Sequence, residues 1–336
     1  QMCIRDRAKD VHPPRGMRDF LPSEKLKRDF VLNTIRATYL NHGFQEIETP
    51  ALEDLERLTS GQGGDNEKLA FRVMKRGEEL ERALAANTDG EELADLGLRY
   101  DLTVPLTRYY ATNRSKLPNV FKAIQTGPVW RAERPQKGRY RQFVQCDIDI
   151  IGDSSHLAEI DILVSSLEAL ESIHLSNATI RMNHRTLLSN LLDHLGIPED
   201  GKPAAMIIID KLDKIFAEGV AKELGEKFGT KAAEAAASWL TTLNADLATP
   251  NELQEIFTAV ESRFGKGRLR FDPTLVRGMG YYTGTIFEIE HPESGTSIGG
   301  GGRYDGMVGR WTGDDVPAVG ISIGFERAVD LVPDSL

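Results

Sequence analysis

Residues 121–152 read FKAIQTGPVWRAERPQKGRYRQFVQCDIDIIG and predict two strands joined by a basic loop. Side chains in the second strand alternate between two faces, because successive strand residues point in opposite directions. One face carries Arg141, Phe143, Gln145, Asp147 and Asp149, and the other carries Gln142, Val144, Cys146, Ile148 and Ile150. The pattern predicts a strand with one face in the core and one polar face.

The polar face holds groups that are costly to bury. Gln145 and Asp149 need partners when removed from water, so this face is either solvated or built to hold a ligand. The first strand favours a ligand, because Arg131 and Glu133 are predicted to share one of its faces. The connecting loop adds further polar and basic groups: Arg134, Gln136, Lys137 and Arg139. Arginine forks match phosphate oxygens in pairs and stay charged when desolvated, so the set suits a polyanion lying along a sheet.

Length and composition limit the class of protein. The chain has 336 residues, 40% hydrophobic and 27% charged, which allows a large core and predicts two units. No apolar run approaches the roughly 20 residues that span a bilayer, so we expect no membrane association and a cytoplasmic location. The net charge of −10 argues against a general nucleic-acid coat, so any contact with RNA must be local.

Several chemistries are excluded by what the chain lacks. Cys3 and Cys146 fit neither a disulfide framework nor a CxxC metal site, and Cys146 is expected in the core. The seven histidines show no metal-binding spacing, and no serine or cysteine occupies a nucleophile elbow. Residues 1–12 have no readable pattern and are predicted to be disordered or a sequence scar.

Apolar spacing outlines the elements before and after the hairpin. Helices are predicted over 23–42, through Leu26, Phe30, Ile35 and Tyr39, and after Gly152, capped by Asp153 or Ser154 with a stripe of Leu157, Ile160, Val164 and Leu167. A strand is predicted over 44–50, and a mobile surface loop over 78–96. The segment from Leu98 begins as a strand and becomes a helix near Pro105, which leaves Asp101 and Thr103 at the strand end.

The chain changes character at about residue 183. Residues 183–266 are rich in alanine, glutamate and lysine and predict an inserted helical domain. From residue 267 the sequence again shows patterns typical of strands. The expected division is therefore core over 13–182, insertion over 183–266 and core again over 267–336. Strand runs without regular alternation with helices predict an α+β fold, a mostly antiparallel sheet flanked by helices.

Glycine-rich segments near the end of the chain leave alternatives open. Neither Gly278 and Gly280 nor the run 299–302 fits a dinucleotide fingerprint or a P-loop, and a bulge or a close backbone approach is expected at Gly278 and Gly280. Arg277 is either a solvated strand residue or a functional group. Arg327 is predicted in the first turn of a helix, where it needs either a protein carboxylate or a phosphate as its partner.

Six ordered segments resemble histidyl-tRNA synthetases of the class II family. They are PRGMRDF at 14–20, GFQEIETP at 43–50, LRYDLT at 98–103, WRAERPQKGRYRQFVQCDID at 130–149, LVRGMGYYTGTIFE at 275–288 and GISIGFER at 320–327. The second, fourth and sixth resemble class II motifs 1, 2 and 3, and the fifth resembles the signature of the histidine enzyme.

The resemblance implies a role for each site residue. Arg131 and Arg277 would meet the α-phosphate of ATP, Glu133 the adenine, and Arg139 and Arg327 the γ-phosphate, with Mg²⁺ on the phosphates and no protein cage for the metal. Asp101, Thr103 and Gln145 would hold the α-ammonium of L-histidine. Asp149 and Tyr282 would bond its imidazole, with Tyr281 beside them. The implied partners are ATP, L-histidine, tRNA(His) and a second copy of the chain.

The chain departs from the family at several points. Asp101 and Asp149 are shorter acids than the glutamates often found there, and Gly280 replaces a frequent aspartate. The chain stops at Leu336, so the C-terminal anticodon-binding domain is expected to be absent and tRNA charging to be weakened. A competing interpretation is the histidine-binding regulatory subunit of ATP phosphoribosyltransferase. The ligase is favoured by five groups that a regulator without phosphate chemistry does not need: Arg131, Glu133, Arg139, Arg277 and Arg327.

Overall fold

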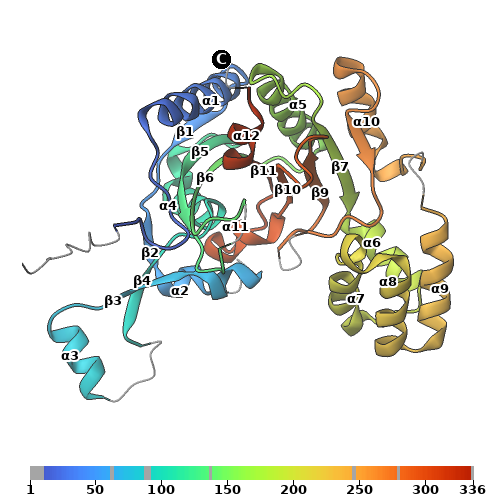
Figure 1. Cartoon of the computed structure of the whole chain (residues 1–336), viewed down its shortest axis with the longest axis horizontal. Helices are drawn as coiled ribbons and strands as arrows, with labels where there is room; N and C mark the ends of the chain where they lie inside the picture. The colour runs from blue at the N-terminus through green and yellow to red at the C-terminus, as the bar shows by residue number, and fades with distance from the viewer. Residues whose placement is uncertain are drawn as a thin grey trace, which may run out of the picture.

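The computed structural model describes residues 11–60, 64–86, 92–135, 138–243, 247–277 and 281–333. Within them an eight-stranded sheet forms the centre of the molecule (Figure 1). Its strand order is β1 (Gln45–Ile47), β5 (Phe121–Trp130), β6 (Gln142–Ile151), β11 (Ala318–Gly324), β10 (Gly299–Arg303), β9 (Thr285–Glu290), β7 (Thr179–His184) and β8 (Leu269–Phe271). Only the outermost pairs, β1 with β5 and β7 with β8, run parallel. The predicted mostly antiparallel α+β fold is confirmed.

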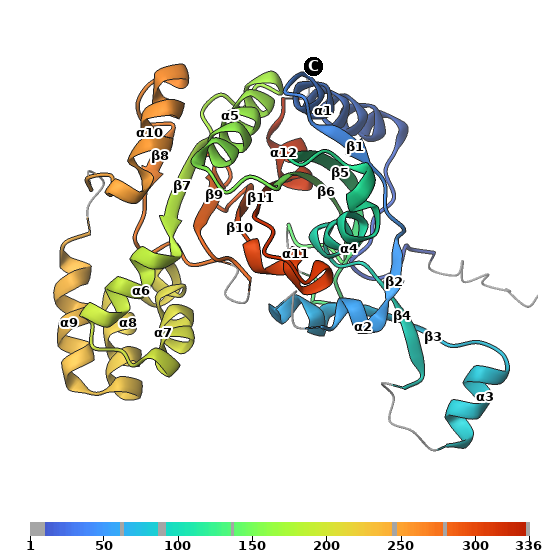
Figure 2. The ribbon, with the colours of Figure 1, turned by 180° about the vertical axis from the view of Figure 1, so that it is seen from behind.

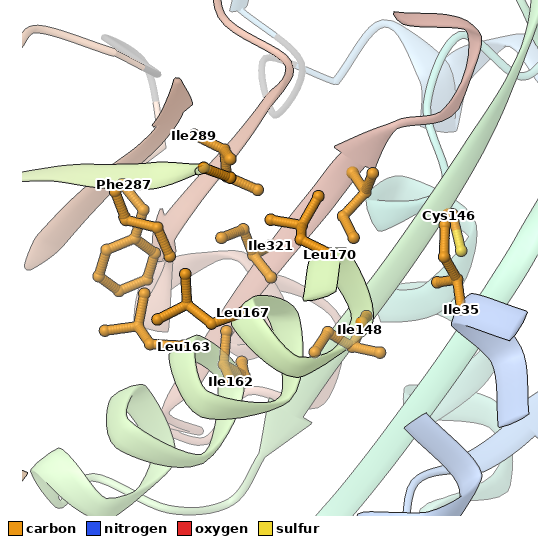
Figure 3. Packing of buried hydrophobic residues seen from close by; sticks show 14 of the residues in the cluster. Ile35, Cys146, Ile148, Ile162, Leu163, Leu167, Leu170, Phe287, Ile289 and Ile321 are labelled. Carbon is orange, nitrogen blue, oxygen red and sulfur yellow. The ribbon is translucent and has the colours of Figure 1, made fainter. Parts of the chain in front are cut away.

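Helices cover one face of this sheet. They are α1 (Pro22–Asn41), α5 (His156–Ser172), α10 (Asn251–Phe264) and α12 (Phe325–Leu331). Side chains of α1 and α5, among them Ile35, Leu163 and Leu167, pack against Ile148 of β6 and Ile321 of β11 (Figure 3). Cys146 is fully buried in the same cluster, as predicted. This main cluster fixes the sheet and leaves its opposite face free for other groups.

The two predicted helices form, but with different buried stripes. On α1 the buried residues include Val31, Ile35 and Tyr39, whereas the predicted Leu26 and Phe30 are 72% and 42% exposed. On α5 the prediction was wrong for Leu157, which is exposed, and also for the cap, because the residue at the N-cap is Ser155 and neither Asp153 nor Ser154. Asp153 contributes to the start of α5 by accepting the N–H of Ser155 at 2.8 Å.

A second layer lies at one end of the sheet. It contains a three-stranded sheet of β2 (Leu52–Asp54), β4 (Ala94–Leu98) and β3 (Phe71–Met74), with η1 (Gly64–Leu69), η2 (Arg114–Lys116) and the helices α2 (Leu55–Leu58), α3 (Glu78–Ala85), α4 (Thr103–Asn113) and α11 (Asp305–Thr312). Leu58, Tyr100, Leu106 and Val308 pack together in its core. The prediction of a surface loop over 78–96 was wrong, because α3 and β4 form in this stretch. Figures 1 and 2 show α3 standing away from the body.

A helical unit lies beyond the edge of the sheet that β7 and β8 form (Figure 2). Its elements are α6 (Arg185–His194), η3 (Glu199–Gly201), α7 (Lys202–Ile209), α8 (Leu212–Phe228) and α9 (Thr230–Thr241). Leu192, Leu224 and Ala236 lie in a second apolar cluster, which also includes Leu275 and Ile286 of β9. Ile256 and Val260 of α10 instead belong to the main cluster. The exact boundaries of an inserted domain within 183–266 stay a prediction.

Candidate active site

The face of the sheet opposite the helices gathers the predicted site residues. Cys146, Ile148 and Ile321 point into the main cluster, so the alternate residues of β6 and β11 point the other way. We call this surface the site face and define it by Gln125 of β5, Gln145, Asp147 and Asp149 of β6, Gly320, Ser322 and Gly324 of β11, Gly300 and Gly302 of β10, and Glu288 of β9. Register confirms the alignment, because Asp149 is paired with Gly320 and Gln145 with Gly324.

Glycines on the site face make room for functional side chains. A Cβ at Gly320 would lie 1.9 Å from Oδ1 of Asp149, and one at Gly300 would lie 2.5 Å from Nη1 of Arg277. Both distances are too short for real atoms, so any larger residue would displace these side chains. Gly278 and Gly280 lie outside the described residues.

One end of the site face is acidic. Asp149 is 3% exposed, and the hydroxyl of Tyr304 donates to its Oδ1 at 2.5 Å. Burial raises the pKa of Asp149 to about 7, although the Tyr304 hydrogen bond opposes the shift. Burial and then the charge of Asp149 also raise the pKa of Asp147. The carboxylates on β6 are thus buried, and the solvated alternative is excluded for them.

Gln145 has an unused hydrogen-bonding atom within this acidic end. Its Nε2 donates to Oδ2 of Asp147 at 3.3 Å and to the hydroxyl of Ser322 at 3.4 Å. Its Oε1 is buried and finds no hydrogen-bond partner among the residues that the structure describes. Leaving a buried carbonyl oxygen without a hydrogen-bond donor costs free energy, and a ligand with an N–H group at this position would supply the missing donor.

Residues from the flanking loops complete the acidic end. Asp101 precedes α4, and its Oδ1 accepts the N–H of Val104 at 3.1 Å, which places Thr103 at the first position of that helix. Burial raises the pKa of Asp101, and the nearby charge of Arg131 opposes the shift. The rings of Tyr281 and Tyr282 lie with centroids 4.4 Å apart. Burial raises the pKa of both tyrosines. The charge of Asp101 also raises the pKa of Tyr281, and that of Asp149 the pKa of Tyr282, so each tyrosine lies near one of these carboxylates.

Cationic side chains converge at the other end. Nη1 of Arg277 donates to Oε2 of Glu288 at 2.5 Å and to the hydroxyl of Ser297 at 3.2 Å. Arg327 donates to the carbonyl of the same Ser297, which brings the two arginines together. Burial lowers the pKa of Arg327, and the charges of Arg139 and Arg277 lower it further. Arg327 thus lies near two other cations, and such a group of cations suits an anion.

The loop between β5 and β6 supplies the remaining predicted groups. β5 ends at Trp130, so the prediction that Arg131 and Glu133 belong to the strand was wrong. Arg131 donates from Nε to the carbonyl of Tyr100 at 3.0 Å and stacks 5.0 Å from the ring centroid of Phe143. Glu133 pairs with Arg139 at 3.6 Å. Gln136 and Lys137 lie outside the described residues.

Sequence reasoning missed several residues at this surface. Tyr304 has no local sequence signal, because it meets Asp149 only through the pairing of β10 with β11 and β11 with β6. Glu288 is the carboxylate that holds Arg277, and Ser297 joins Arg277 to Arg327. Asp147 was placed on the polar face of β6 by its alternation with Gln145, but no role was assigned to it.

The described part of the chain shows neither a cluster of metal-binding side chains nor a membrane-spanning helix. No group of three or more histidine, cysteine, aspartate or glutamate side chains there could hold a metal ion. Among its helices, none has both the length and the apolar character needed to cross a membrane.

Comparison with known proteins identifies the family of the chain. Residues 16–328 match the family model described as histidyl-tRNA synthetase. The histidine–tRNA ligase of Leifsonia xyli is 53% identical over 97% of this chain and 81% of that protein, and that of Christiangramia forsetii is 37% identical over 94% and 75%. The crystal structure of histidyl-tRNA synthetase from Nostoc sp. PCC 7120 superposes with a TM-score of 0.71 at 29% identity, covering 96% of this chain and 75% of that one.

A Bacillus halodurans protein described as an ATP phosphoribosyltransferase regulatory subunit/histidyl-tRNA synthetase superposes with a TM-score of 0.76. It is 21% identical and covers 96% of this chain and 84% of its own, so the likeness concerns the fold alone. An antiparallel sheet with helices on one face and this polar face opposite defines the core of a class II aminoacyl-tRNA ligase. The family model and the curated relatives then decide the member: the chain belongs to the histidyl-tRNA synthetase family.

Proposed function

We propose that the chain activates L-histidine with ATP to histidyl-adenylate, releases pyrophosphate, and then transfers histidine to the 3′ end of tRNA(His). One observation carries the proposal. Buried carboxylates and an unused amide oxygen lie on one face of the sheet, and the guanidinium of Arg277, with Arg139 and Arg327 near it, lies beside them. The reaction needs an ammonium-bearing substrate and a triphosphate held side by side, and the two ends of the site face suit these two charges.

The acidic end fits histidine. The α-ammonium would lie among Asp101, Thr103 and Gln145, where the unsatisfied Oε1 of Gln145 would accept a hydrogen bond from one of its N–H groups. Asp149 and Tyr282 would bond the two imidazole nitrogens, with Tyr281 beside them. An acceptor and a hydroxyl together read both nitrogens of an imidazole, and an apolar side chain in their place would leave both groups unpaired.

The arginine end fits ATP. Arg131 and Arg277 would contact the α-phosphate from two sides, Glu133 the adenine, and Arg139 and Arg327 the γ-phosphate. Guanidinium groups suit this task because they stay charged and bond phosphate oxygens in pairs. Mg²⁺ bound to the phosphates would neutralise negative charge on the β- and γ-oxygens.

The chemistry needs no nucleophile from the protein. A carboxylate oxygen of histidine attacks the α-phosphorus, the bond from that phosphorus to the bridging oxygen breaks, and pyrophosphate leaves with its electron pair. The chain holds the two anions in line and stabilises charge on the equatorial oxygens through Arg131 and Arg277. In the second step the adenylate carbonyl is attacked by a ribose hydroxyl at the 3′ end of tRNA, and AMP leaves.

We also propose a cytoplasmic homodimer joined through α1 and β1. Support comes from α1, where Leu26 and Phe30 are 72% and 42% exposed on the surface away from the main cluster. Large apolar side chains repeated along one helix face favour burial against another protein surface. Sedimentation at micromolar concentration checks this, and a monomer there would contradict it.

Histidine-dependent exchange of pyrophosphate into ATP tests the proposal. Arg277→Ala should reduce the exchange rate by 10²-fold or more while histidine binding, measured by calorimetry, is largely retained. Arg270→Ala is the matched control, because Arg270 lies on β8, is 45% exposed and pairs with Glu290 rather than with the site. A wild-type chain that binds histidine without catalysing exchange would instead support the regulatory-subunit alternative.

A further inference from the structure

The segment 14–20, PRGMRDF, has no role in the proposed reaction, yet it lies against the loop of residues 131–141. The N–H of Arg141 donates to the carbonyl of Gly16 at 2.7 Å. Gly16 has φ +82°, and a Cβ there would lie 2.7 Å from Cγ of Pro135 and 2.9 Å from Cγ of Arg141. The segment is therefore packed closely on the loop that carries Glu133 and Arg139.

Arg18 extends this contact in two directions. Its guanidinium lies 3.5 Å from the ring centroid of Tyr140, the residue after Arg139. Its Nη2 donates to Oε2 of Glu326 at 2.5 Å, and Glu326 precedes Arg327 in α12. One side chain thus touches the neighbours of both arginines that the proposed function assigns to the γ-phosphate.

Glu326 is fixed by partners from several elements. Arg28 of α1 donates to both carboxylate oxygens, at 2.5 and 2.9 Å, and the N–H of Val144 donates to Oε1 at 3.1 Å. Burial raises the pKa of Glu326, but the hydrogen bond and charge of Arg28, with Val144 and Arg18, lower it below its usual value. The start of α12 is therefore anchored without Arg18. What Arg18 adds is a link from this anchored point to the loop.

We propose that Arg18 is a positioning residue for the nucleotide: through Tyr140 and Glu326 it sets the placement of Arg139 relative to Arg327. The two cations repel each other and come from separate elements, so in the free protein nothing in their own charges brings them together. Holding the loop near α12 before ATP arrives removes part of the ordering that binding would otherwise require. The inference rests on the proposed function, because it assumes that both arginines contact the γ-phosphate.

Exchange kinetics with Arg18→Met test the inference. The stack on Tyr140 is partly buried, so its loss should raise KM for ATP about tenfold, equivalent to about 1.4 kcal/mol, with KM for histidine unchanged. Arg15→Met is the matched control in the same segment, because Arg15 is exposed, and it should leave both constants unchanged. Tyr140→Leu should reproduce the effect, and the double variant should be no worse than the more affected single one.

A second measurement separates positioning from general loosening. A non-hydrolysable histidyl-adenylate analogue lacks the β- and γ-phosphates, so its dissociation constant should not change in Arg18→Met. Equal weakening of ATP and the analogue, or an unchanged KM for ATP, would overturn the inference. If Arg18→Met does not fold, Arg18→Lys keeps the charge beside Glu326 and weakens the planar stack, and the same comparison applies. A wild-type chain without exchange activity would refute the proposed function itself, whereas an active wild type with an unaffected variant refutes only the inference.

Discussion

Arg303→Met should be among the most destabilising single changes in this chain. Arg303 ends β10 and is 8% exposed, and Glu159 of α5 is 1% exposed. The two form a bidentate pair, with Nη2 to Oε2 at 2.5 Å and Nε to Oε1 at 2.7 Å. In the variant, Glu159 would keep only the hydroxyl of Thr285, at 3.0 Å, among the bonds described for its side chain. A buried charge left without its partner costs about 3–5 kcal/mol of unfolding free energy.

A double variant separates the cost of losing the ion pair from the cost of leaving one buried charge unpaired. Because desolvation nearly offsets the attraction inside a buried ion pair, replacing both partners by apolar residues is far less harmful than removing one. Glu159→Leu with Arg303→Met should therefore cost less than Arg303→Met alone. The resulting coupling free energy should exceed roughly 2 kcal/mol. Arg57→Met is the control, because the side chains of Arg57 and its partner Asp54 are 40% and 55% exposed, and it should cost under about 1 kcal/mol.

Urea unfolding followed by tryptophan fluorescence measures these differences. Trp239 lies in α9 of the helical unit, so a Trp239→Phe background leaves Trp130 and Trp311, which report on the main sheet and its flanking helices. Agreement between fluorescence and far-ultraviolet circular dichroism is required before a free energy is taken. A loss under about 1 kcal/mol for Arg303→Met, or strict additivity in the double variant, would refute the reasoning.

Other changes test the site face itself. Asp149 has a folded-state pKa of about 7 against an ordinary value of 3.8, so the folded chain keeps this proton while the unfolded chain loses it, and stability falls as pH rises through that window. Asp149→Asn should remove this loss and be more stable than wild type by about 4 kcal/mol at pH 8 but not at pH 4, measured by denaturant unfolding; a pH-independent difference would contradict the sign. Gly300→Ala should displace the Arg277 guanidinium, 2.5 Å from the new Cβ, and slow pyrophosphate exchange at least tenfold with histidine binding retained, whereas Gly306→Ala in α11, with open space around it, should leave exchange unchanged.

The polar alternation of β6 was predictable from the sequence because its signal is local. Alternation in residues 141–149 depends only on the two-residue repeat of a strand, and β6 forms over Gln142–Ile151 as that pattern requires. Arg327 was likewise placed in the first turn of a helix, since GISIG is a strand followed by a break, and α12 begins at Phe325. Features of this kind need no knowledge of distant neighbours.

The misses depend on contacts between distant parts of the chain. Tyr304 reaches Asp149 across 155 positions of sequence, through two strand pairings whose register the sequence does not specify. The stripe on α1 was misjudged at Leu26 because apolar spacing shows that a face is apolar and not what covers it. Residues 78–96 were predicted as a loop from their charge, yet Glu78–Ala85 forms a helix with none of its residues buried, so no core signal marked it.

The register of β6 and β11 explains why the two ends of the site face suit one joined product. Gln145 and Asp149 point the same way on β6, and four residues of strand separate their Cα atoms by about 14 Å. Gly320 and Gly324 lie opposite them on β11, and the chain passes from Gly324 directly into α12, which carries Arg327. A histidine with its imidazole at Asp149 and its ammonium at Gln145 would therefore direct its carboxylate toward the arginines. In the proposed histidyl-adenylate the imidazole would thus lie at Asp149 and the adenylate at the arginines, in the order in which these groups follow one another along β6 and into α12.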